Sequence, residues 1–228
     1  MTVDDEHEPP DTAVLVVDDH ELVGTSVMLN LRAEGIQAAR WVAGGADDVL
    51  AAAAQLDPGL VLLDLDLGRD AAGRRVDGVE LVEPLLAAGW RVLVLTGSPD
   101  HARIGAALAA GALAWVPKHA SFPTLLAAVR SAVAGDRVMP TAHHRQLVEV
   151  FRRRSAERQE LTAKIDRLTQ REREVLAELA HGHRAQAVAD RFVVSLTTVR
   201  SQIRAVLSKL EVGSQLEAVA LYRRATGR

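Results

Sequence analysis

Short apolar runs that end in carboxylates constrain the fold of this chain more than any other feature of its sequence. Residues 60–63 are all apolar and lead into Asp64, and residues 13–17 lead into Asp18 and Asp19. Apolar runs of this length with polar flanks are typical of strands buried on both faces of a parallel sheet covered by helices. Because the carboxyl ends of such strands meet at one edge of the sheet, the sequence predicts an acidic pocket there.

Two further apolar runs end in groups that could act on the same pocket. Residues 92–95 lead into Thr96, and residues 113–117 lead into Lys118. Carboxylates suit a hard cation such as Mg2+, and a carboxylate can attack phosphorus while an ammonium and a hydroxyl stabilise the charge. Taken singly, each residue could be a turn former, a helix cap or a solvated side chain. Their shared position after separate apolar runs favours one common site.

This arrangement resembles the receiver domain of bacterial two-component response regulators, from residue 13 to about residue 134. The resemblance implies that Asp64 accepts a phosphoryl group. It also implies that Asp18, Asp19 and Asp64 hold Mg2+, with the backbone carbonyl of Asp66 completing the metal site.

The same resemblance assigns the sensing of the phosphoryl group to Thr96 and Lys118, and the aromatic switch position to Trp115. The sequence departs from the family after the acceptor, where a short loop with an early proline is usual. Residues 68–76 are longer than that loop and contain no proline. We therefore expect an extended loop over residues 65–77.

The charge is distributed unevenly along the 228 residues. Residues 1–140 contain 10 Lys or Arg and 20 Asp or Glu, whereas residues 141–228 contain 17 and 10. An acidic first half suits cation binding, and a basic second half suits a polyanion such as DNA. The chain has no cysteine, which excludes disulfides and thiolate metal sites. No apolar run approaches the roughly 18 residues of a membrane span, so we expect a cytoplasmic protein.

The sequence predicts four segments along the chain. Residues 1–11 form an acidic disordered tail, residues 12–134 the first domain, residues 135–167 a linker with a helix, and residues 168–228 the second domain. Pro140 stops a simple continuation of the preceding helix. We expect the linker helix to pack on a partner in only some states of the protein.

The second domain contains the parts of a helix-turn-helix. Thr169 and Glu172 form the pattern of a capping box at the start of its first helix. Apolar spacing predicts a second helix near residues 184–191, then a tight turn, a third helix from about residue 196 and a last helix near residues 214–223.

The third helix carries the residues expected to contact DNA. Arg200, Ser201 and Arg204 lie away from its apolar face, and Thr198 lies nearby. Arginine can bind guanine through two hydrogen bonds, and hydroxyl groups make adaptable contacts with bases or phosphates. An ordinary exposed basic helix would have the same composition, so this stretch alone leaves both possibilities open.

Residues 168–221 as a whole resemble the LuxR-type output domain of NarL/FixJ response regulators. The resemblance depends on three matching stretches: Leu168-Thr169-x-Arg171-Glu172-x-Glu174-Val175-Leu176, Thr198-Val199-Arg200 and Lys209-Leu210-x-Val212. It implies base contacts from Arg200, Ser201 and Arg204, and a contact between Lys209 and the DNA backbone.

The two resemblances together imply an α/β doubly wound, flavodoxin-like domain with a parallel five-stranded sheet, then a linker helix and a small all-α helix-turn-helix domain. They imply a DNA-binding transcriptional regulator rather than an enzyme. Its implied partners are Mg2+, a cognate sensor histidine kinase, double-stranded DNA and a second copy of the chain when active.

Two other functions stay open at the level of the sequence. One is a DNA-binding regulator controlled by a ligand or a protein without phosphorylation. The other is a phosphatase of the haloacid-dehalogenase type, in which Asp64 would be the nucleophile and Asp66, two residues on, the acid/base.

Overall fold

The structure is a computed structural model that describes residues 13–41 and 44–226. The chain forms two compact units, residues 1–152 and residues 153–228, and each is described by itself. The expected tail at residues 1–11 lies outside the described residues.

The first unit is built on a five-stranded parallel sheet in the order β2-β1-β3-β6-β7. The strands are β1 (Val14–Val17), β2 (Ala38–Arg40), β3 (Leu60–Leu63), β6 (Arg91–Thr96) and β7 (Ala114–Pro117). Every residue of β1 and β3 is buried, as expected for central strands covered on both faces. The predicted doubly wound fold is therefore confirmed.

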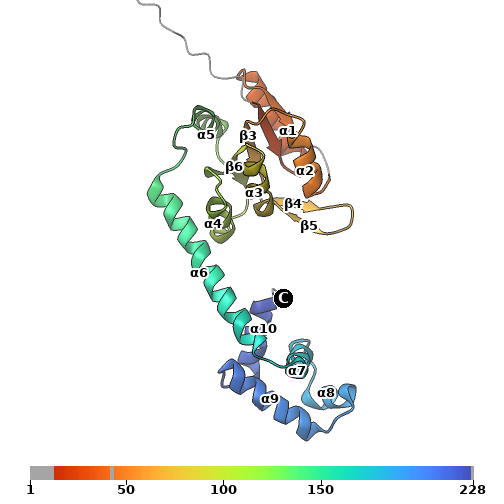
Figure 1. Ribbon diagram of the computed structural model, residues 1–228. Coiled ribbons are helices and arrows are strands. Elements are labelled where there is room, and N and C mark those ends of the chain that lie inside the picture. The colour runs from red at the N-terminus through yellow and green to blue at the C-terminus, as the bar shows by residue number, and fades with distance from the viewer. Residues whose placement is uncertain (1–12, 42–43, 227–228) are drawn as a thin grey trace, which may run out of the picture. The chain divides into compact units, whose positions relative to one another are not determined.

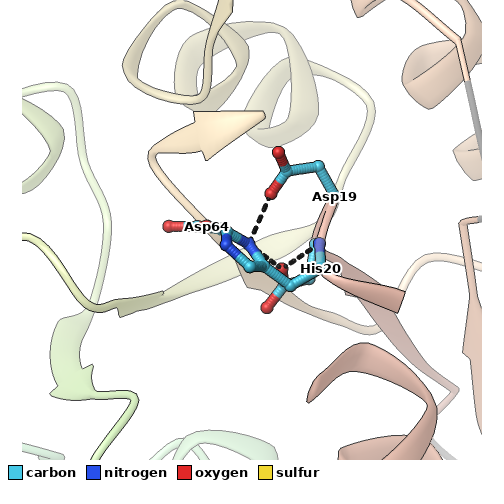
Figure 2. Close-up of side chains that lie close together, drawn as sticks. Asp19, His20 and Asp64 are labelled. Carbon is cyan, nitrogen blue, oxygen red and sulfur yellow. Dashed lines mark hydrogen bonds and ion pairs between the residues drawn. The ribbon is translucent and has the colours of Figure 1, made fainter. Parts of the chain in front are cut away.

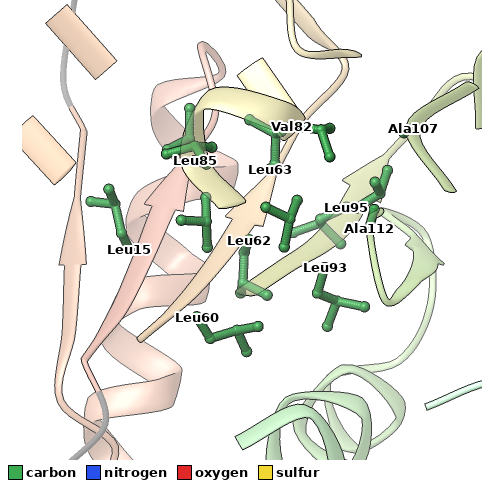
Figure 3. Close-up of a cluster of buried hydrophobic side chains, with 14 of the residues drawn as sticks. Leu15, Leu60, Leu62, Leu63, Val82, Leu85, Leu93, Leu95, Ala107 and Ala112 are labelled. Atoms are coloured by element: carbon green, nitrogen blue, oxygen red, sulfur yellow. The ribbon is translucent and has the colours of Figure 1, made fainter. Parts of the chain in front are cut away.

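Five helices connect and cover these strands (Figure 1). They are α1 (Glu21–Ala33), α2 (Ala46–Ala53), α3 (Val79–Ala87), α4 (His101–Ala109) and α5 (Phe122–Ala134). Helices α2, α3 and α4 pack side by side. An ion pair between Arg130 of α5 and Glu34 at the end of α1 joins those two helices. Figure 3 shows Val82 and Leu85 of α3 among leucines of β1, β3 and β6, which form the aliphatic core.

The segment after β3 is a β-hairpin rather than the expected loop. Strands β4 (Asp66–Arg69) and β5 (Arg75–Asp77) pair antiparallel. Asp70 begins the turn between them: its carbonyl accepts from the Gly73 N–H at 2.9 Å, and Gly73 has a φ of 76°. Asp at the first turn position and Gly with positive φ at the fourth are a hairpin signal that the sequence did contain.

Helix α6 (Thr141–Asp166) begins in the first unit, and its early turns belong to that unit's core. Leu147 is 2% exposed, and Val148 is also buried. The expected linker helix is therefore present, and its first part is packed in this structure.

After the end of α6, the described part of the second unit contains four further helices, as the sequence predicted. They are α7 (Gln170–Ala180), α8 (Ala185–Phe192), α9 (Leu196–Leu210) and α10 (Gln215–Thr226). The predicted capping box is confirmed, because Thr169 Oγ accepts from the Glu172 N–H while the Glu172 carboxylate accepts from the Thr169 N–H. Val193 turns the chain between α8 and α9 with a φ of 53°.

Candidate functional site

Two buried carboxylates lie next to each other at the carboxyl edge of the sheet. Val17 of β1 is in register with Leu63 of β3, so the residues that follow them, Asp18 and Asp64, leave the sheet side by side. Asp18 is 1% exposed and Asp64 2% exposed. Like charges this close and this dry need a neutralising cation.

Lys118, directly after β7, supplies a positive charge between these two carboxylates. Its Nζ lies 2.7 Å from Asp18 Oδ2 and 2.7 Å from Asp64 Oδ2. Burial lowers the pKa of Lys118, but hydrogen bonds to the two aspartates outweigh it and leave that pKa above its ordinary value. Burial raises the pKa of Asp64, and the hydrogen bond from Lys118 offsets this only in part. The ammonium therefore stays charged at neutral pH.

His20 also belongs to this pocket, although no role for it was predicted from the sequence. Its Nδ1 lies 2.7 Å from Asp19 Oδ1, and its backbone N–H donates to Asp18 Oδ1 at 2.8 Å. Figure 2 shows the imidazole beside Asp19 and Asp64. The available signal was its position directly after the two aspartates at the end of a strand.

The donor set fits a hard divalent cation. Ligand atoms of Asp18, Asp19, His20 and Asp64 all lie within 4.8 Å of one another. Asp64 Oδ1 is buried and has no hydrogen-bond partner among the residues that the structure describes. An orphaned, buried carboxylate oxygen is costly unless a cation or another group pairs with it. The carboxylate of Asp66 is not part of this group.

Thr96 and Trp115 lie on the strands next to the pocket. Thr96 ends β6, is 1% exposed, and its Oγ1 accepts a hydrogen bond from the Ser98 N–H at 3.2 Å. That leaves its hydroxyl hydrogen free to donate. Trp115, on β7, is half-buried and makes an edge contact with His101 of α4. The structure thus places Thr96 at the carboxyl edge of the sheet and Trp115 beside α4.

In the second unit, α9 presents exposed polar and basic side chains. Thr198, Arg200, Ser201 and Arg204 are exposed, while Val199 is fully buried in the helix-turn-helix core. Over the described part of the chain, neither Arg200 nor Arg204 has an ion-pair or hydrogen-bond partner. Two unpaired guanidinium groups one turn apart on a helix can bind phosphates or base edges.

The family comparisons agree with both parts of this geometry. Residues 14–130 match the response regulator receiver domain family, and residues 166–222 match the luxR family of bacterial regulatory proteins. The chain is a NarL/FixJ-type response regulator.

Similar proteins cover nearly the whole response regulator. The transcriptional regulatory protein LnrK of Bacillus subtilis is 30% identical over 215 residues, covering 92% of this chain and 94% of that protein. The response regulator protein VraR of Staphylococcus aureus is 32% identical over 210 residues, covering 90% and 93%. A solved structure of RcsB from Salmonella enterica serovar Typhimurium has a TM-score of 0.51 at 21% identity, covers 94% of this chain and 98% of that one, and supports the fold alone.

The regulator uses the carboxylate of Asp66 for contacts outside the pocket. Arg103 of α4 and Arg75 of β5 both bind Asp66 Oδ1, the former at 2.8 Å. Burial raises the pKa of Asp66, but these hydrogen bonds outweigh it, so the pKa lies below its ordinary value. The role of Arg103 was not predictable from the sequence, because no local pattern links residues 37 positions apart.

Lys209 of the regulator has a partner within its own domain. Its Nζ lies 2.7 Å from Glu172 Oε2, which joins α9 to the capping box of α7. Burial raises the pKa of Glu172, but hydrogen bonds from Lys209 and Thr169 outweigh it and leave the pKa below the ordinary value. A contact between Lys209 and DNA stays a prediction.

In the described ranges, no helix combines the length and the apolar character that a membrane span needs.

Proposed function

We propose that this response regulator is a phosphorylation-controlled transcription factor in which Asp64 is the phosphoacceptor. The observation that carries this proposal is the state of the Asp64 carboxylate. One of its oxygens is held by Lys118 at 2.7 Å, and the other is buried without a hydrogen-bond partner among the described residues. A carboxylate with one oxygen fixed and one available is arranged for nucleophilic attack.

Each residue around Asp64 would have its own role in phosphoryl transfer. An oxygen of Asp64 attacks phosphorus, an acyl phosphate forms, and the bond between phosphorus and the leaving group of the donor breaks. The donor would be the phosphohistidine of a cognate sensor kinase. Lys118 stabilises negative charge on the phosphoryl oxygens, and the hydroxyl of Thr96 donates a hydrogen bond to one of them. Asp18 and Asp19, with Asp64 and the Asp66 carbonyl, would hold Mg2+, which neutralises charge during transfer.

The contacts of Asp66 count against the phosphatase alternative. An acid/base two residues after the nucleophile must hold and release a proton during turnover. Asp66 instead accepts hydrogen bonds from Arg75 and Arg103, and its pKa is lowered. A carboxylate held ionised by two guanidinium groups is a poor general acid.

We further propose that α9 enters the major groove of operator DNA. Arg200, Ser201 and Arg204 would contact base edges, with Thr198 and Lys209 nearer to the backbone. A helix-turn-helix domain reads a two-fold site as a dimer, because the spacing of half-sites mirrors protein symmetry. Phosphorylation would favour the DNA-competent dimer. Couplings of this kind are typically about 1–3 kcal/mol, so the shift would be partial and concentration-dependent.

Mass spectrometry after incubation with acetyl phosphate and Mg2+ tests the acceptor. We expect one added phosphoryl group in the wild type, sensitive to hydroxylamine, and none in Asp64→Asn or in the presence of EDTA. Asp70→Asn is the matched control, because Asp70 lies in the neighbouring hairpin and pairs with Arg74. Undiminished labelling of Asp64→Asn would reject the assignment.

Sedimentation and DNA binding on matched phosphorylated and unphosphorylated samples test the control step. We expect tighter self-association and tighter DNA binding after phosphorylation. If labelled and unlabelled samples associate identically and bind DNA identically, regulation without phosphorylation becomes the better explanation.

A further inference from the structure

A single arginine of α4 holds both ends of the segment that follows the acceptor. We call residues 65–77 the acceptor loop; it contains the β4–β5 hairpin. Arg103 Nη1 donates to Asp66 Oδ1 at 2.8 Å, and Nη2 donates to the Leu65 carbonyl at 2.6 Å and to Asp77 Oδ1 at 2.7 Å. Leu65 and Asp66 begin the acceptor loop, and Asp77 ends it.

These contacts form a strong tie rather than an incidental surface pair. The Arg103 side chain is 21% exposed, and its partners are two carboxylates and a carbonyl. Burial lowers the pKa of Arg103, but hydrogen bonds to Asp77 and Asp66 outweigh it and raise the pKa. Hydrogen bonds between ionised groups are stronger than neutral ones, and the rigid planar fork of guanidinium fixes their direction.

Helix α4 makes a second close contact two residues further on. A Cβ placed on Gly105 would lie 2.1 Å from the Leu147 carbonyl oxygen and 3.0 Å from Phe151 Cβ. The backbones of α4 and α6 therefore touch, and only glycine permits the approach. Leu147 belongs to the buried core of the first unit.

Arg103 and Gly105 therefore place two contacts on the same helix. Positions two residues apart in a helix point in different directions, so one helix can bind the acceptor loop through Arg103 and α6 through Gly105. Helix α6 continues without a break from Thr141 in the first unit to Asp166 in the second (Figure 1).

We propose that Arg103 is a positioning residue that ties the acceptor loop to α4, and that α4 transmits the state of this loop to α6 through Gly105. The proposal rests on the proposed function of Asp64. A phosphoryl group there adds roughly −1.5 to −2 charges one residue before the Leu65 carbonyl that Arg103 holds. The guanidinium then meets a competing anion, the tie loosens, and α4 releases the start of α6.

Hydrogen exchange on the full-length, unphosphorylated chain tests the tie directly. In Arg103→Gln we expect the amides of the acceptor loop and of residues 147–151 to exchange faster, on the order of tenfold, because charge-assisted hydrogen bonds no longer oppose local opening. Arg103→Lys keeps the charge but loses the fork, so it should restore protection only in part. Arg130→Gln is the matched control, since it removes an arginine pair from α5 and should change neither segment.

Gly105→Ala disturbs the contact of α4 with α6 and leaves the contacts of Arg103 with the acceptor loop in place. It should speed exchange at residues 147–151 and leave the acceptor loop protected. Faster exchange of the acceptor loop in Arg103→Gln with no change at residues 147–151 would overturn the relay. A uniform increase over the whole first unit would also overturn it, because Arg103 would then be a general stabilising residue.

Phosphorylated wild type separates this inference from the proposed function. If Asp64 is labelled and residues 147–151 exchange faster in wild type but not further in Arg103→Gln, the relay is supported. If Asp64 is labelled and exchange at residues 147–151 does not change, the relay fails while the acceptor assignment stands. If nothing is labelled, the proposed function fails, and the unphosphorylated variants still decide whether the tie exists. If Arg103→Gln does not fold, Asp77→Asn tests the contact between Arg103 and the acceptor loop, and Gly105→Ala tests the contact between α4 and α6.

Discussion

The pocket around Asp64 and helix α9, called the recognition helix here for its proposed role, both depend on charged side chains, but they use them in opposite ways. In the pocket, Lys118 is held between Asp18 and Asp64 and is largely buried. On α9, Arg200 and Arg204 are exposed, and nothing in the described part of the chain pairs with them. In the pocket, Lys118 neutralises part of the carboxylate charge from within the protein, whereas on α9 no group in the described part of the chain neutralises the arginines.

Because of this difference, substitutions in the two regions should have different effects on folding and on binding. Removing one member of a buried ion pair leaves its partner uncompensated, so changes in the pocket affect folding and chemistry together. Removing an exposed, unpaired arginine leaves no partner behind, so changes on α9 should affect binding while stability stays the same.

The largest effect is expected from Gly78→Ala, directly after the acceptor loop. A Cβ there would lie 2.1 Å from the Asp64 carbonyl oxygen and 2.8 Å from Leu65 Cα. Both neighbours are backbone, so the acceptor itself must move. We expect a loss of about 3 kcal/mol or more in the free energy of unfolding, together with slower phosphorylation. Urea titration followed by tryptophan fluorescence measures the loss, because all three tryptophans, at positions 41, 90 and 115, belong to the first unit.

Gly73→Ala is the control for this prediction. Gly73 has a φ of 76° and no neighbour within 4 Å of an added Cβ. Its replacement should cost only the roughly 1–2 kcal/mol of a left-handed residue and leave phosphorylation unchanged. Gly78 itself has a φ of −59°, which any residue can adopt. A loss for Gly78→Ala no larger than that for Gly73→Ala, with unchanged phosphorylation, would therefore show that the contact with the Asp64 backbone does not require glycine at residue 78.

The sequence predicted the acidic edge of the pocket better than the segment beside it. Asp18, Asp64, Thr96 and Lys118 each follow an apolar run, and strand order brings run ends together, so a local pattern sufficed. The hairpin was interpreted as a loop, although its turn residues were visible. The tie through Arg103 had no such signal, because it depends on how α4 packs and not on spacing along the chain.

The helix-turn-helix shows the same limit. Apolar spacing and the Thr169–Glu172 capping box were enough to predict its helices. The conformation of Val193 was not predictable, because β-branched residues rarely adopt positive φ and the surrounding helices impose it. The partner of Lys209 was also missed, since Glu172 lies 37 residues away and was already assigned to the cap.

The second prediction concerns binding by the recognition helix. Arg200→Ala and Arg204→Ala should each weaken binding to a selected operator duplex by about 1–3 kcal/mol and relax its sequence preference. Fluorescence anisotropy on a duplex selected from a random library with the wild type measures this. Arg224→Ala, on α10, is a control for the loss of one positive charge. If these variants lost as much free energy of unfolding as free energy of DNA binding, α9 would respond to substitution as the pocket does, and the difference between the two regions would not hold.

The smallest effect on stability is expected from replacing Lys209. This residue pairs with a carboxylate of its own unit, as Lys118 does in the pocket. The lowered pKa of Glu172 means that this carboxylate binds protons less readily when folded than when unfolded, where its value is about 4.5. Its contribution to stability is therefore complete above pH 4.5 and is lost as the pH falls further through the lower folded value. Lys209→Met should reduce stability at neutral pH by about 1 kcal/mol or less, because the pair is partly exposed. The difference from wild type should shrink below pH 4.5.

Fluorotyrosine NMR at Tyr222, the one tyrosine of the chain, reports unfolding of this unit, since Tyr222 packs against its core. Arg200→Met, which removes a charge from the same helix but has no carboxylate partner in the described part of the chain, is the control, and its difference from wild type should not change over this pH range. If the Lys209→Met difference also stays constant with pH, the Glu172 pair contributes nothing to folding, and Lys209 is left, like Arg200 and Arg204, for DNA alone.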